Sequence, residues 1–130
     1  MNDRDLLNKI KKVEEYLIGK AQEKFIDNDL QTLARNFGAM ESDRQFVSFI
    51  QKIFPMINQI RHARDPKLSL ITSIVRSQTG GSDVGVCKQA VENGKINADD
   101  ERLSTPDGMR KIVQELQRDV INYYKKEANQ

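Results

Sequence analysis

Apolar residues recur at helical spacing along most of the chain, and they are densest between Ser42 and Arg64. The apolar positions of this stretch are Phe46, Val47, Phe49, Ile50, Ile53, Phe54, Met56, Ile57 and Ile60. They cover most of the circumference of a helix, which predicts that this helix lies in the centre of a bundle. Ser42 followed by Gln45 is typical of a capping box at its start. Pro55 lacks a backbone donor, which predicts a kink near residues 51–54 or a break into two helices.

Similar patterns predict two helices before this central one. Residues 4 to about 25 keep one face apolar and line the other with charge, which is typical of a helix on the surface of a core. Asp27 or Asp29 then caps a short second helix. Gly38 follows its last apolar residue and is well placed to end it in the left-handed conformation.

Two proline-containing caps predict helices in the second half of the chain. Asp65-Pro66 begins a fourth helix that ends at Thr79-Gly80-Gly81, and Thr105-Pro106 begins the last helix. The residues that the fourth helix would bury are Leu68, Ile71, Ile74 and Val75. The buried stripe of the last helix consists of Met109, Ile112, Val113, Leu116, Val120 and Tyr123.

The predicted fold is therefore all-α: a compact bundle of about five helices in a single domain over residues 1–130. A flexible loop is expected over about 78–104, within which residues 84–91 form either a short helix stopped by Asn93-Gly94 or an extended segment. The tail over 125–130 is expected to fray.

Composition narrows the class of protein. Apolar residues make up 38% of the chain and charged residues 31%, which is typical of a water-soluble helical domain. Cys87 is the single cysteine and has no partner for an internal disulfide, so we expect a cytoplasmic protein. No apolar run approaches the roughly 20 residues that a membrane helix needs.

The charges are unevenly distributed, with basic residues over the central helix and its exit and acidic residues over 92–107. The candidate nucleic-acid-binding residues are Arg61, Arg64, Lys67, Arg76 and Lys52. Arg61 and Arg64 are three positions apart and share a helix face. Guanidinium groups on a rigid helix suit contact with phosphates, and such contacts read no sequence. The alternative interpretation is a solvated face whose arginines pair with Asp65 or with the acidic loop.

The patterns that would indicate an enzyme or a metal site are incomplete. His62 and Cys87 would make a nucleophile pair only with an orienting group that the sequence does not supply. The run 93–100 is similar to half of a calcium-binding loop, but Gln89 and Val91 stand where ligands belong. Gly80-Gly81 lacks the residues of a phosphate-binding loop. We therefore expect no catalytic residues, no cofactor and no metal.

One known family has a similar organisation. The chain contains LARNFG, then the capped helix FVSFIQKIFPMINQI, which leads into RHARD. Across about residues 28–124 this order resembles the small helical subunits of CRISPR effector complexes. The resemblance implies a helical bundle that stacks in copies along a guide-RNA complex and contacts the nucleic-acid backbone without cleaving it.

Two classes of function follow from these patterns. The first is a non-catalytic subunit of a ribonucleoprotein assembly, for which the resemblance implies a role in antiviral defence. Its partners would be a larger protein assembly, copies of itself and the backbone of single-stranded DNA or RNA, and no membrane. The second is a protein-interaction or regulatory module without a nucleic-acid role.

Overall fold

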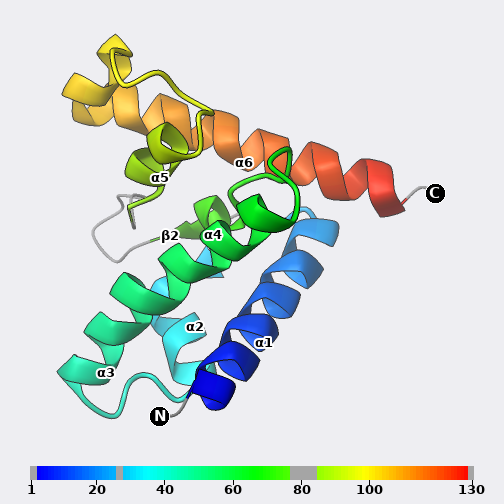
Figure 1. Ribbon diagram of the computed structural model, residues 1–130, viewed down its shortest axis with the longest axis vertical. Helices are drawn as coiled ribbons and strands as arrows, with labels where there is room; N and C mark the ends of the chain where they lie inside the picture. Colours follow the sequence, from blue (N-terminus) through cyan, green and yellow to red (C-terminus); the bar gives the residue numbers. More distant parts are fainter. Residues whose placement is uncertain (1–2, 26–27, 77–84, 129–130) are drawn as a thin grey trace.

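The structure is a computed structural model that describes residues 3–25, 28–76 and 85–128, and its fold is all-α, as predicted (Figure 1). The α-helices are α1 (Asp3–Gln22), α2 (Leu30–Asn36), α3 (Asp43–Ser48), α4 (Phe54–Arg64), α5 (Val86–Glu92) and α6 (Pro106–Ala128). A π-helical turn, η1 (Phe49–Ile53), joins α3 to α4. Two 3₁₀ turns are η2 (Ile71–Ile74) and η3 (Glu101–Ser104).

The first two caps lie where the sequence predicts them. Asp29 caps α2 by accepting a hydrogen bond from the backbone N–H of Thr32, and Gly38 ends the segment at φ 69°. Ser42 accepts a 3.2 Å hydrogen bond from the N–H of Gln45, which begins the central helix. These local side-chain contacts satisfy backbone donors that have no partner within the helix.

The central helix is continuous from Asp43 to Arg64 and is not broken at Pro55. Pro55 has no N–H to donate to the preceding turn, and the backbone accommodates this with the π-helical turn η1. The N–H of Phe54 donates to the carbonyl of Phe49, five residues earlier, in place of the usual four. The predicted irregularity is thus present, as a wider turn over 49–53.

The prediction of a fourth helix that begins at Asp65-Pro66 is wrong. Asp65 ends α4 instead of beginning a helix, and its carboxylate accepts a 3.0 Å hydrogen bond from the N–H of Lys67. This local turn competes with a helix that would start at Pro66. The chain then forms η2 and the two-residue strand β2 (Val75–Arg76). The end predicted at residues 79–81 lies outside the described residues.

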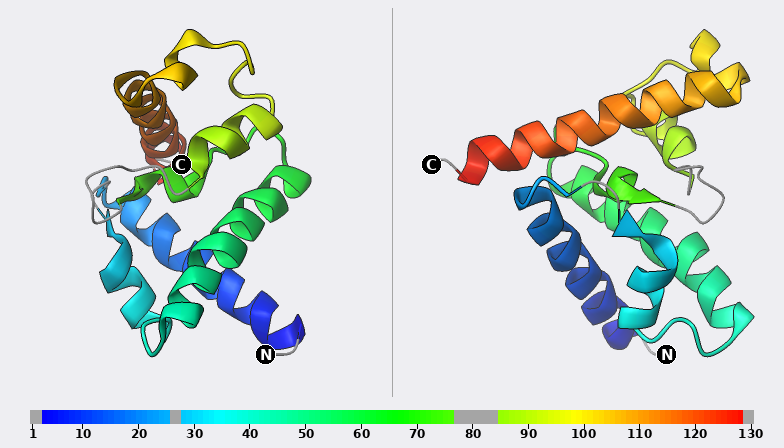
Figure 2. Two further views of the ribbon diagram at one scale, coloured as in Figure 1. Left: turned by 90° about the vertical axis from the view of Figure 1, so that its left-hand side faces the viewer. Right: turned by 180° about the vertical axis from the view of Figure 1, so that it is seen from behind.

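Strand β2 pairs in parallel with β1 (Asn28–Asp29), which lies beside it in Figure 2. Asn28 reinforces the pairing, since its side-chain amide donates to the carbonyl of Ile74 at 3.0 Å. The pairing fixes the segment before α2 against the segment after α4.

Residues 78–84 of the loop predicted over about 78–104 lie outside the described residues, and the remainder contains a helix and a 3₁₀ turn. Residues 86–92 are helical, and α5 ends at Asn93 and Gly94, which has φ 75°. In η3, Arg102 donates to the carboxylate of Asp100 at 2.8 and 3.0 Å, and these hydrogen bonds lower the pKa of Asp100 to about 2. The last helix begins as predicted, with the Thr105 hydroxyl accepting from the N–H of Gly108. It continues to Ala128, beyond the point where fraying was predicted.

Two hydrophobic clusters share α6. The larger cluster joins α1, α2, the central helix and η2 to Val120 and Tyr124, and Phe49 is only 1% exposed within it. The smaller cluster packs α5 and Leu70 against the first half of α6. Helix α6 crosses the ends of α1 and α4 (Figure 2). In its stripe, Tyr124 takes the buried position predicted for Tyr123, which is 38% exposed.

Candidate functional site

Arg61 lies inside the protein, and the prediction that it reaches the surface is wrong. Its side chain is 2% exposed, and its Nη1 lies 3.0 Å from Oε2 of Glu14 on α1. Charged side chains are buried only when they are paired, and Glu14 provides the pair. The last turn of α4 therefore directs this guanidinium towards α1, into the interior of the protein.

Arg61 also contacts the loop after α4 and helix α6. Its Nε donates to the carbonyl of Ser69 at 3.3 Å, which fixes the loop between α4 and η2. Its guanidinium lies 5.7 Å from the ring centre of Tyr124 on α6. Burial raises the pKa of the Tyr124 hydroxyl, and the charge of Arg61 opposes that rise. One buried cation thus joins α1, the 65–70 loop and α6.

The other predicted residues have different positions. The Arg64 side chain is 58% exposed, with Nη1 3.5 Å from the same Glu14 oxygen. Lys67 and Lys52 are exposed, but they lie just beyond the end of α4 and in η1, so they belong to separate surfaces. Arg76 is in β2, and its side chain is outside the description. The structure therefore does not bring the five residues into one cluster.

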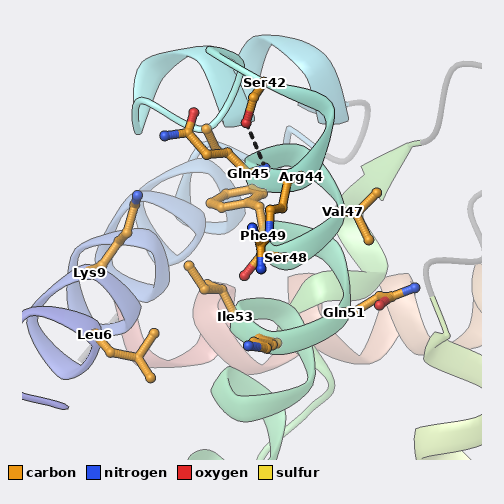
Figure 3. Close-up of a pocket in the computed structure, with 12 residues that line it drawn as sticks. Leu6, Lys9, Ser42, Arg44, Gln45, Val47, Ser48, Phe49, Gln51 and Ile53 are labelled. Carbon is orange, nitrogen blue, oxygen red and sulfur yellow. Dashed lines mark hydrogen bonds between the residues drawn. The ribbon is translucent and has the colours of Figure 1, made fainter. Parts of the chain in front are cut away.

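Lys52 lies in a groove between α1 and the first half of the central helix, with a volume of about 420 Å³ (Figure 3). We call this site the basic groove. Its lining residues are Leu6, Lys9, Ala39, Ser42, Arg44, Gln45, Val47, Ser48, Phe49, Gln51, Lys52 and Ile53. Lys9, Arg44 and Lys52 are its cations, and no acidic side chain is among these lining residues.

Figure 3 shows how the two walls of the basic groove face each other. Leu6 and Lys9 project from α1, and Phe49 and Ile53 lie on the helix opposite, while Val47 points to another side. Among the described residues, no carboxylate lies within ion-pair distance of the Lys9, Arg44 or Lys52 side chains. The sequence indicated Lys52 alone, because Lys9 comes from a distant helix.

Lys67 lies in a second, smaller cavity of about 280 Å³, which we call the polar pocket. Its lining residues are Lys67, Ser69, Lys95, Asp119, Asn122 and Tyr123. They come from three segments: the 65–70 loop, the loop that follows α5, and helix α6 itself. No local sequence pattern therefore connects them. Arg61 contacts two residues at or beside this pocket: it donates a hydrogen bond to the carbonyl of Ser69 and packs against the ring of Tyr124.

The residues considered for catalysis or metal binding make contacts of the kind that stabilise a fold. Cys87 is buried in the smaller cluster, with Sγ 3.8 Å from the carbonyl of Met109. Asp100, in the run that resembles half a calcium loop, accepts a hydrogen bond from Arg102. Over 3–25, 28–76 and 85–128, no group of three or more His, Cys, Asp or Glu side chains could hold a metal ion. Gly80-Gly81 lies outside these ranges.

The helices of the described part of the chain include none that combines the length and the apolar character needed to cross a membrane. Comparison with models of protein families gives no match. Comparisons with curated proteins and with solved structures give none either. The geometry of the two sites therefore carries the functional argument.

Proposed function

We propose that the protein is a non-catalytic helical subunit of a ribonucleoprotein assembly and contacts the nucleic-acid backbone through the basic groove. The observation that supports this best is the set of cations in the groove: Lys9, Arg44 and Lys52, with no acidic side chain in the lining. Phosphate groups are the chemistry that such a surface favours. The small subunit of a CRISPR effector complex is the particular role that the organisation of the sequence suggests.

The lining of the basic groove offers no exposed aromatic ring on which a base could stack. Phe49 is 1% exposed and Ile53 is 4% exposed, so neither offers a free aromatic or polar edge to a base. Sequence-specific recognition needs base-edge contacts, whereas cations positioned along a groove recognise only the backbone. A subunit of this kind would hold a strand whose sequence is read by other means.

The π-helical turn contributes to the arrangement of the cations. Lys52 lies within η1, and Arg44 lies before this widened segment, in the first turn of α3. A π-helical turn changes the angular relation between side chains before and after it, and such turns occur often at functional sites. Pro55 would thus help to set the direction of Lys52 relative to Lys9 on α1.

A charge-reversal experiment tests this proposal. The variant Arg44→Glu/Lys52→Glu should bind non-specific single-stranded RNA at least tenfold more weakly than the wild type, because two phosphate contacts become repulsive. The matched control is Lys88→Glu/Lys111→Glu, which makes the same change in net charge at exposed positions on α5 and α6. Equal losses in both variants would mean that net charge alone, and not the groove, determines binding.

A protein-interaction module is the second candidate, and one observation favours it. Val47 lies at the edge of the same groove, points away from the wall that faces α1, and is 46% exposed, so a partner could contact it beside the groove. A partner protein with an acidic, amphipathic helix would use this side chain as well as the cations. Val47→Ser should then weaken binding of that partner, whereas it should leave RNA binding unchanged.

A further inference from the structure

We propose that the polar pocket binds a single ribonucleotide unit of a strand. Its phosphate would lie between Lys67 and Lys95, its base against Tyr123, and its ribose hydroxyl would donate to Asp119. This inference rests on the proposed function in taking RNA as the ligand, but it adds a second site. It also adds a preference for ribose that the basic groove cannot supply.

The two lysines provide the phosphate part of the site. They come from different loops and line the same cavity. No carboxylate among the described residues forms an ion pair with either ammonium group, although Asp119 shares the pocket. Two unpaired ammonium groups on converging loops are suited to an anion that carries more than one charged oxygen.

Tyr123 provides the surface for a base. Tyr123 is 38% exposed, whereas Tyr124, the next residue on the helix, is buried. The ring is also held in place, because its centre lies 4.8 Å from that of Tyr124 with an angle of 79° between the planes. Tyr124 is buried and packs under Arg61. An exposed aromatic ring with a fixed partner is the kind of platform on which bases stack.

Polar groups complete the recognition of the sugar and the base. Asp119 and Asn122 lie on α6 beside Tyr123, and carboxylates commonly accept hydrogen bonds from ribose hydroxyl groups. Ser69 also lines the pocket, and its buried hydroxyl has no hydrogen-bond partner in the described ranges. The 2′-hydroxyl is the group that lets a protein distinguish RNA from DNA.

The size of the polar pocket agrees with one nucleotide. Its volume of about 280 Å³ is at the lower end of that of small-molecule sites, which start near ~300 Å³. Arg61 would act as a positioning residue for this site, because it holds Ser69 through a hydrogen bond and Tyr124 through its ring. Arg61 and Lys67 would then act at one site, as the sequence predicts, but Arg61 would position other residues and would not contact the phosphate.

Titration with mononucleotides tests the inference. The chain has no tryptophan and three tyrosines, so its tyrosine emission includes that of Tyr123, and comparison with Tyr123→Leu identifies the part that Tyr123 contributes. Adenosine 5′-monophosphate should quench this emission and bind more tightly than inorganic phosphate or the 2′-deoxy analogue. Tyr123→Leu should weaken binding of the nucleotide about tenfold, as measured by calorimetry, without affecting phosphate. Lys67→Gln should weaken both, and Asp119→Asn should remove the preference over the deoxy analogue.

Three results would overturn the inference: no binding of the nucleotide, binding unaffected by Lys67→Gln and Tyr123→Leu, or binding no tighter than that of inorganic phosphate. Equal affinity for the ribose and deoxyribose forms would remove the assignment of Asp119. The variant Arg44→Glu/Lys52→Glu separates this inference from the proposed function, since it should leave mononucleotide binding intact. If that variant loses RNA binding but the mononucleotide never binds, only the polar pocket fails.

Discussion

Arg61 and Glu14 form an ion pair inside the protein, with Nη1 3.0 Å from Oε2 and side chains that are 2% and 10% exposed. The pair joins α4 to α1 across the larger hydrophobic cluster. A sequence in which Arg61 follows an apolar helix and precedes two further basic residues gives the impression of a surface cluster. In the folded protein, the same arginine stabilises the contact between the two helices.

Arg61→Met should lower the free energy of unfolding by about 3–5 kcal/mol, because Glu14 would remain buried with only the more distant, exposed Arg64 near it. Urea denaturation measures this change. Arg64→Met is the control, because Arg64 is 58% exposed and its pairing with Glu14 should contribute less than about 1 kcal/mol. Similar losses in the two variants would contradict the assignment of Arg61 as the buried partner.

Phe49→Ala should cost about 3–5 kcal/mol, since Phe49 is 1% exposed and its ring packs 5.1 Å from that of Phe54. Val47→Ala, two residues earlier and 46% exposed, should change stability by no more than about 0.5 kcal/mol. Thermal unfolding of both variants makes the comparison. A fall of only a degree or two in the melting temperature of Phe49→Ala would show that the central helix is misplaced.

Two glycines should respond to alanine in opposite directions. Gly19 lies within α1 with no atom in the way of a Cβ, so Gly19→Ala should stabilise the protein by about 0.5–1 kcal/mol. At Gly108 a Cβ would overlap the backbone of Arg102, so Gly108→Ala should destabilise it by about 1–3 kcal/mol. Chemical denaturation of the two variants measures whether each free energy of unfolding rises or falls. If Gly108→Ala were also stabilising, the contact between η3 and α6 would be looser than described.

Pro55→Ala should change nucleic-acid binding more than it changes stability. Alanine restores an N–H that can donate to the preceding turn, so the π-helical turn is no longer required. Loss of that turn would rotate Arg44 relative to the residues of α4 and alter the basic groove. Calorimetric titration with single-stranded RNA, beside a melting curve, compares the two effects. Unchanged affinity in a variant that has lost the π-helical turn would remove any role for η1 in binding.

The sequence predicts those helices whose start and end are marked by neighbouring residues. Ser42 with Gln45, Asp29 with Thr32, and Thr105 with Gly108 all form the expected caps. Asp65 shows the limit of this reasoning. The same residue type before a proline predicts a cap, but its carboxylate accepts from Lys67 two residues on, and the chain then pairs as a strand with Asn28.

The candidate sites were predicted less well, for a related reason. Lys52 and Lys67 are exposed, and each lines a cavity. Their neighbours Lys9 and Lys95 come from elements far away in the sequence, and no periodic pattern shows such a contact. The burial of Arg61 depends on Glu14, whose own pattern is that of a solvated helix face.

The central claim is that cations of the basic groove contact phosphates, and the salt dependence of RNA binding tests it most directly. Each phosphate contact with a single strand contributes about −0.7 to the slope of log affinity against log salt. Lys9, Arg44 and Lys52 should together contribute about −2 to the slope of the wild-type protein. In Arg44→Glu/Lys52→Glu the slope should become shallower by at least about 1.4, with the helical content unchanged. A double variant with the slope and affinity of the wild type would contradict the account.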